Sequence, residues 1–232
     1  MNFKIWVIII LFYFFILMNK HNILNNLNTG DLILFQGKHS FISSLINMFT
    51  NSRWTHIGVV LKDPEFIDKQ LTGLYLWESG DEDFPDSEDN KYKYGAQIVD
   101  LKEKIKTYDG MVVARILKCN RDDFATKLKI IHNTVHNKPY DVNVFDFIMT
   151  KLGITSLDQG SFKYKLLNWL GYNPRKVDKM YCSSLVAYIY TELGLIDANT
   201  RWTDIFPVYF SSENPKLKLI NATLGPEEYI HG

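Results

Sequence analysis

Cys182 stands at the start of a segment with helical spacing, a position that favours a reactive thiol. Apolar residues at three- and four-residue steps mark one face of this helix: Leu185, Val186, Ile189 and Leu193. Cys182 then lies in the first turn, where unpaired backbone N–H groups and the helix dipole stabilise a thiolate. The same N–H groups could stabilise an oxyanion during acyl transfer. The alternative is a buried cysteine that packs as a small hydrophobic residue.

A cysteine nucleophile needs a base, and His56 is the best candidate among the six histidines. It opens the apolar run HIGVVL, which is typical of a buried strand. A polar ring at the head of a buried strand needs a partner, and Gly58 permits another group to approach closely. The alternative is a core histidine with a purely structural hydrogen bond.

A third group usually fixes the tautomer of such a histidine, and Glu78 is the best candidate for this role. It ends the next apolar run, LYLWE, and antiparallel pairing of this run with HIGVVL could bring its carboxylate beside His56. The alternative is an exposed carboxylate at the end of a strand. A further alternative for Cys182 is a disulfide with Cys119, if the domain is exported.

Two other clusters of polar residues are expected to be solvated. His132 and His136 have the i, i+4 spacing of a metal pair, but they lack the glutamate of an HExxH motif and a visible third ligand. The segment 81–93 holds six carboxylates without the spacing of a calcium-binding loop. We therefore expect no metal site and no cofactor. The six carboxylates are those of Asp81, Glu82, Asp83, Asp86, Glu88 and Asp89.

Length and charge narrow the class of protein. The 232 residues suffice for one good core but not for two generous domains. Lysine and arginine balance aspartate and glutamate at 26 each, so no nucleic-acid partner is expected. The two cysteines form no CxxC pair, which argues against a zinc ribbon or a thioredoxin-like motif.

The order of predicted elements favours an α+β fold, because strands cluster early and helices late. Residues 21–29 are predicted to form a short tether, and residues 183–193 a helix that ends at Gly194. The predicted strands cover residues 31–35, 56–61, 74–78, 97–101 and 111–117, and further helices cover residues 41–49 and 122–136.

The N-terminus contains fourteen consecutive apolar residues, at positions 5–18. This is short of the roughly 20 residues that span a bilayer, although flanking lysines could extend the reach. No small-residue cleavage pattern follows the run. An uncleaved membrane anchor over residues 1–21 is therefore favoured, with a cleaved signal peptide or an interfacial helix as alternatives. The expected location is membrane-associated, or otherwise secreted.

Five short motifs in a fixed order resemble the circularly permuted NlpC/P60 group, and especially its YiiX-like and poxvirus-type papain-fold enzymes. In that group the histidine strand precedes the cysteine helix, as it does here. The motifs are residues 30–33 (GDLI), 55–58 (THIG), 77–78 (WE), 138–141 (KPYD) and 181–186 (YCSSLV).

The resemblance covers about residues 28–195 and implies a catalytic triad of Cys182, His56 and Glu78. It also implies structural or site-lining roles for Asp31, Tyr140 and Tyr181. The implied fold is a permuted papain-like domain over residues 22–232, with an antiparallel sheet or small barrel packed on helices. An inserted helical segment is expected at residues 143–178.

The predicted function is thiol-dependent hydrolysis of amide, peptide or acyl-ester bonds through a thioester. This chemistry allows peptides, amides and lipids as substrates. An enzyme of this kind would be classed as a thiol protease. One alternative is acyl transfer by a lipid-acting enzyme of the same fold. Another is a non-catalytic membrane or virion component that retains the fold.

Overall fold

The computed structural model describes residues 20–37, 52–80, 83–139, 180–213 and 216–231, and within them a six-stranded antiparallel sheet organises the chain. The strand order is β4-β3-β2-β1-β5-β6. The sheet is open and antiparallel, which agrees with the predicted α+β class. Of the two predicted forms, an antiparallel sheet or a small barrel, the described residues show the sheet. The strands are β1 Leu32–Gly37, β2 His56–Lys62, β3 Leu74–Gly80, β4 Gly95–Asp100, β5 Gly110–Lys118 and β6 Thr223–His231.

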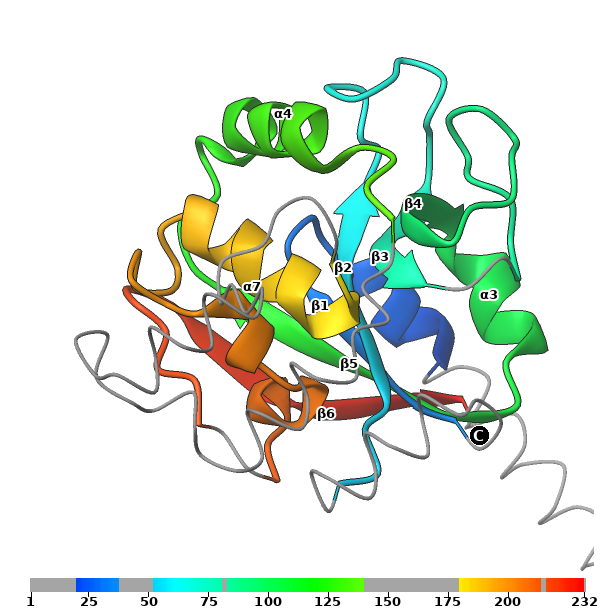
Figure 1. Cartoon of the computed structure of the whole chain (residues 1–232). Helices are drawn as coiled ribbons and strands as arrows, with labels where there is room; N and C mark the ends of the chain where they lie inside the picture. Colours follow the sequence, from blue (N-terminus) through cyan, green and yellow to red (C-terminus); the bar gives the residue numbers. More distant parts are fainter. Residues whose placement is uncertain (1–19, 38–51, 81–82, 140–179, 214–215, 232) are drawn as a thin grey trace, which may run out of the picture.

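Three labelled helices and two short 3₁₀ turns accompany the sheet. Helix α7 packs across β2 and β3 and also contacts α4, whereas α3 follows directly from β4 and packs against β3 (Figure 1). Residues 20–26 are also helical, whereas residues 21–29 were predicted to form a tether. The elements are α3 Leu101–Thr107, α4 Phe124–Val135, α7 Cys182–Glu192, η2 Trp202–Asp204 and η3 Pro207–Phe210.

The sheet separates two apolar cores because successive side chains of a strand point to opposite faces. In β2, Ile57 and Val59 join the core under α7 and α4, while Val60 joins the core near α3. Every strand predicted from the apolar runs is present, with ends that differ by at most two residues. The helix predicted at residues 41–49 and the insert predicted at residues 143–178 lie outside the described residues.

Asp31 ties the start of β1 to the end of β5, which supports a structural role. Its fully buried carboxylate accepts hydrogen bonds from the backbone N–H groups of Asn28 and Leu117, both at 2.8 Å, and from the Arg121 guanidinium at 2.9 Å. Burial raises the pKa of Asp31, although these donors and the charge of Arg121 oppose the rise. Nearby, the Tyr190 hydroxyl donates to the Gly30 carbonyl at 2.7 Å and links α7 to the same corner.

The prediction of a single N-terminal membrane anchor, and with it of a membrane-associated location, is contradicted. Among the described residues, none of the helices has both the length and the apolar character that crossing a bilayer requires. The apolar run itself, at residues 5–18, lies outside the described part of the chain. We therefore do not retain the anchor.

We expect Asp31→Ala to destabilise the fold. The buried Leu117 N–H loses its acceptor, which costs about 1–3 kcal/mol, and the Asn28 N–H adds to the loss. Urea denaturation followed by circular dichroism measures the change. The control is Asp123→Ala, which removes an exposed carboxylate with a surface ion pair and should change the unfolding free energy by less than about 1 kcal/mol. Equal effects of the two substitutions would contradict the role of Asp31.

Candidate active site

The start of α7 is fixed to β3 by hydrogen bonds on both sides of Met180. The Ser79 hydroxyl donates to the Met180 carbonyl at 2.6 Å, and the Met180 N–H donates to the Pro139 carbonyl at 3.1 Å. Ser184 accepts from the Tyr181 N–H at 3.0 Å, so its hydroxyl closes the first turn. Cys182 is therefore held at the first helical position, where the sequence predicts it, and is 1% exposed.

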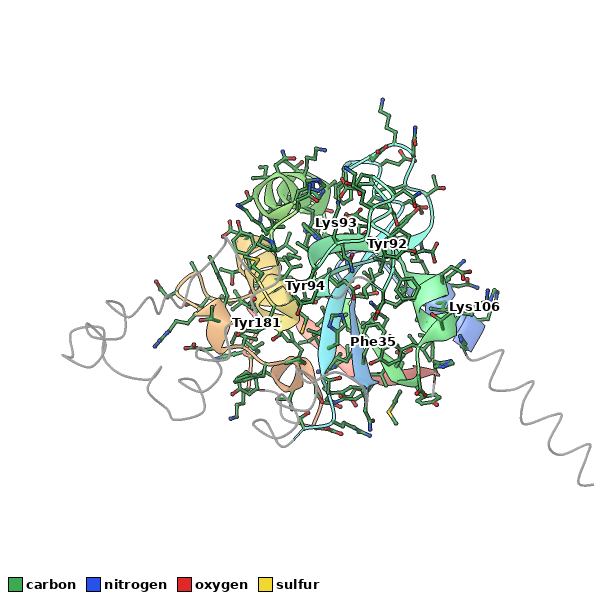
Figure 2. All side chains as sticks on the ribbon, turned by 45° about the vertical axis from the view of Figure 1, so that its right-hand side comes forward. Phe35, Tyr92, Lys93, Tyr94, Lys106 and Tyr181 are labelled. Atoms are coloured by element: carbon green, nitrogen blue, oxygen red, sulfur yellow. The ribbon has the colours of Figure 1, made fainter. Side chains whose placement is uncertain are left out.

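Tyr181 joins the start of α7 to η2. Its side chain is buried, and its hydroxyl donates to the Thr203 carbonyl in η2, while the neighbouring Ser183 hydroxyl donates to the Ile205 carbonyl at 2.6 Å. Figure 2 labels Tyr181 at the beginning of α7. Tyr140, the other residue predicted to line the site, lies outside the described residues.

The pairing of β2 with β3 brings His56 and Glu78 together. The strands are antiparallel, as predicted, and Val59 pairs with Trp77, so Glu78 lies opposite Gly58 and on the same face as His56. His56 Nε2 lies 2.6 Å from Glu78 Oε2. Gly58 is needed in this arrangement, because a Cβ there would lie 2.7 Å from the Leu76 side chain.

Glu78 is fully buried, yet it remains ionised because several donors surround it. Its Oε1 accepts from Lys104 Nζ at 2.6 Å and from Gln97 Nε2 at 3.2 Å. Burial by itself would raise the pKa of Glu78, but the charges of Lys104 and His56, with their hydrogen bonds, outweigh it and lower the pKa to about 2. The carboxylate therefore acts only as an acceptor, and Nε2 of His56 must carry the proton between them.

The ring of His56 is in contact with Cys182 as well as with Glu78. Burial would lower the pKa of His56, but the charge of Glu78 and a hydrogen bond and charge from the Cys182 side chain raise it to about 9. Because Nε2 faces Glu78, Nδ1 is the ring nitrogen left for the sulfur. The His56 side chain is 19% exposed, so this side of the site is open to solvent. A cysteine, an imidazole and a carboxylate in series can perform nucleophilic acyl chemistry.

Sequence reasoning missed Lys104 and Gln97. Lys104 is 6% exposed, and its ammonium lies 5.3 Å from the Phe84 ring centre and 5.9 Å from that of Phe35, which Figure 2 labels on β1. Such contacts partly replace the water that a buried cation loses. No local signal distinguishes Lys104 from Lys102 and Lys106 in the run LKEKIKT, so only the packing of α3 on β3 identifies it.

A second polar cluster lies apart from this site and corrects the prediction of a solvated helix face. His132 is buried, and Glu88 reaches both histidines of α4 from the loop before β4. Glu88 Oε2 lies 2.9 Å from His132 Nε2 and 3.2 Å from His136 Nδ1. The contact joins residues 44 positions apart, which is why no third partner is visible from local spacing.

Both cysteines are free, so the alternative of a Cys119–Cys182 disulfide is wrong. Cys119 follows β5, is partly buried and contacts the core under α7. Burial raises the pKa of its thiol, which opposes thiolate formation there. Cys182 is thus the one described cysteine with an imidazole beside it.

Comparison with solved structures gives a match of low sequence identity. No protein-family model matches the chain, and no curated protein matches it. Among solved structures, the metalloprotein YiiX from Escherichia coli O157:H7 aligns with a TM-score of 0.45 and 18% identity, over 87% of this chain and 98% of that chain. Likeness at this level transfers neither a fold nor an activity.

The prediction that this protein is a thiol protease is corrected. The matched protein is described as a metalloprotein and not as a thiol protease. The label of thiol protease is withdrawn, because no family model and no curated protein that matches the chain supports it.

We expect the His56–Glu78 contact to stabilise the fold most between pH 4.5 and pH 6.5. The pKa of His56 rises from 6.5 to about 9 on folding, so its contribution is complete below pH 6.5 and is lost as the pH rises through 9. The pKa of Glu78 falls from 4.5 to about 2, so its contribution is complete above pH 4.5 and is lost as the pH falls through 2. Urea denaturation of the natural chain and of His56→Gln across pH 5–10 measures the difference. A difference in unfolding free energy that stays constant from pH 6.5 to 9 would contradict this account.

We expect Lys104→Met alone to destabilise the fold by about 3–5 kcal/mol, because it removes one partner of a buried ion pair. The double variant Lys104→Met/Glu78→Gln should recover much of this loss, since it removes both buried charges. Denaturation of the two single variants and the double variant completes a double-mutant cycle. Additive losses would mean that Lys104 and Glu78 do not interact. Lys106→Met, on the exposed side of α3, is the matched control and should have little effect.

Proposed function

We propose that this protein is a thiol-dependent hydrolase or acyl transferase with a permuted papain-like fold. Cys182 is the nucleophile, His56 is its base, and Glu78 is the positioning residue that orients His56. One observation carries the proposal: the His56 ring contacts both the Glu78 carboxylate, at 2.6 Å, and the Cys182 side chain. The order of the chain, with the histidine strand before the cysteine helix, agrees with the permuted arrangement.

In the first half of the reaction the Cys182 sulfur attacks the carbonyl carbon of an amide or ester. A protonated imidazole beside a cysteine favours the thiolate, which is the reactive form. A C–S bond forms as the carbonyl π bond opens, and the negative charge on oxygen lies near the N–H groups of the first turn of α7. The C–N or C–O bond then breaks, and His56 gives its proton to the leaving amine or alkoxide. The product is a thioester on Cys182.

In the second half, an acceptor attacks the thioester carbon. His56 takes a proton from the acceptor, the C–S bond breaks, and the thiolate is restored. Water as the acceptor gives hydrolysis, while an amine or a hydroxyl gives acyl transfer. Glu78 remains ionised throughout, because Lys104 and Gln97 hold its second oxygen. Its function is to keep the proton on Nε2 and so direct Nδ1 to the sulfur.

The access to the site suggests which acyl groups can react. Cys182 is 1% exposed, whereas the His56 side chain is 19% exposed, so a carbonyl group would approach from the side of the imidazole. The near-complete burial of Cys182 favours a small acyl group over a bulky one. Activated esters of small carboxylic acids are therefore suitable first substrates.

The proposal predicts a Cys182 thioester when the protein is incubated with a small activated ester. Intact-protein mass spectrometry after an acid quench detects the adduct, and peptide mapping locates it. His56→Ala should slow its formation by roughly 100- to 10,000-fold, the usual contribution of a general base. Cys182→Ala should abolish it. Circular dichroism of each variant confirms that the fold is retained.

Cys119→Ala is the matched control, because it removes the other thiol and should leave the adduct unchanged. If Cys182 is acylated in His56→Ala as fast as in the natural chain, then Cys182 reacts without His56 as its base. Absence of any adduct in the natural chain would favour a non-catalytic protein that retains the fold. Either result would contradict the proposal.

A further inference from the structure

We propose that Glu88, His132 and His136 form a binding site for a divalent transition-metal ion of the zinc class. The candidate ligand atoms, one from each side chain, all lie within 4.8 Å of one another. This site is separate from the Cys182 site and has no part in the acyl chemistry proposed above. The ligands come from two segments, the loop before β4 and the C-terminal turn of α4.

The distances suit a small ion. In a tetrahedral zinc site with bonds of about 2.0–2.1 Å, neighbouring ligand atoms are about 3.3 Å apart. Glu88 Oε2 is 2.9 Å from His132 Nε2 and 3.2 Å from His136 Nδ1, so a small outward shift of the carboxylate would admit the ion. Two imidazoles and one carboxylate form the donor set that zinc and its neighbours prefer, whereas calcium and magnesium prefer oxygen alone.

The loop that carries Glu88 is built to hold it in place. Asp86 is buried, and its carboxylate accepts from the Glu88 N–H at 2.8 Å and from Lys93 Nζ at 2.8 Å. The Ser87 N–H donates to the Ile98 carbonyl at 2.7 Å, which joins the loop to β4. Figure 2 shows Lys93 on this loop, near α4. This segment was predicted to be solvated, but its centre is ordered around a buried carboxylate.

His132 is the most buried of the three candidate ligands. It is 6% exposed and packs against Trp77, with ring centres 5.9 Å apart. Within the described part of the chain, its Nδ1 has no hydrogen-bond partner, and Glu88 is the one partner at Nε2. A buried imidazole that the protein satisfies at only one nitrogen is unusual, because unmade buried hydrogen bonds are costly. A metal ion bound at Nε2 would leave Nδ1 unpaired, so the support for the site is the buried Nε2 atom beside the Glu88 carboxylate.

The three ligands leave room for a water molecule or a further ligand, since the His136 side chain is 33% exposed. The ion would join the loop before β4 to α4, next to Trp77. Trp77 precedes Glu78 in β3, so the metal would also brace the strand that carries the proposed catalytic carboxylate.

Cobalt(II) titration of the full chain, without a histidine tag and after treatment with a chelator, tests the proposal. We expect one equivalent to bind with the intense visible absorption of tetrahedral cobalt, and zinc to displace it. Glu88→Gln and His136→Gln should each weaken binding at least tenfold, since even second-shell partners contribute roughly 10- to 100-fold. Both residues are less buried than His132, so their substitution should preserve the fold, which circular dichroism checks.

His21→Gln is the matched control. It removes an exposed histidine in the helical segment of residues 20–26 and should leave cobalt binding unchanged. Cys182→Ala should also bind cobalt normally. A thiolate-to-cobalt charge-transfer band, lost in Cys182→Ala, would place the ion at the other site and overturn the proposal. The absence of tetrahedral cobalt in the natural chain, or equal affinity in Glu88→Gln, would overturn it as well.

Discussion

The negative charge of Glu78 is held in the interior by donors from three separate elements, and the geometry around Cys182 depends on it. His56 comes from β2, Gln97 from β4 and Lys104 from α3. An isolated carboxylate at this depth would take up a proton, because desolvation strongly disfavours its charge. The buried ammonium prevents this, and the ionised carboxylate in turn keeps His56 protonated and oriented. Charge compensation thus links the packing of α3 to the chemistry proposed for the start of α7.

The two faces of the sheet position different parts of the candidate site. The larger apolar core, under α7 and α4, fixes the helix whose first residue is Cys182. The opposite face carries His56 and Glu78 together with α3. The Ser79 hydroxyl donates to the carbonyl of Met180, just before α7 begins. The end of β3 therefore positions Cys182 as well as Glu78. A site at the end of the strands, between the two layers, follows from this arrangement.

Apolar runs predicted the strands and both long helices well, because each buries a face whose period is visible locally. His56, Glu78 and Cys182 were identifiable for a similar reason, as polar residues at the ends of such runs. Lys104 and Glu88 were not, since their partners lie 26 and 44 positions away and nothing in their own segments marks them. Helix α3 was missed because LKEKIKT has four charged and only two apolar residues, and strand β6 because Gly225 and Pro226 interrupt the apolar pattern of TLGPEEYIH.

Nitrogen-detected NMR of the His56 ring during a pH titration tests the central claim most directly. The account predicts that His56 stays protonated through neutral pH and titrates near 9, with its Nε2 proton retained beside Glu78. In Glu78→Gln the pKa should fall by at least one unit towards the ordinary value of about 6.5. A His56 pKa near 6.5 in the natural chain, unchanged by Glu78→Gln, would contradict the account.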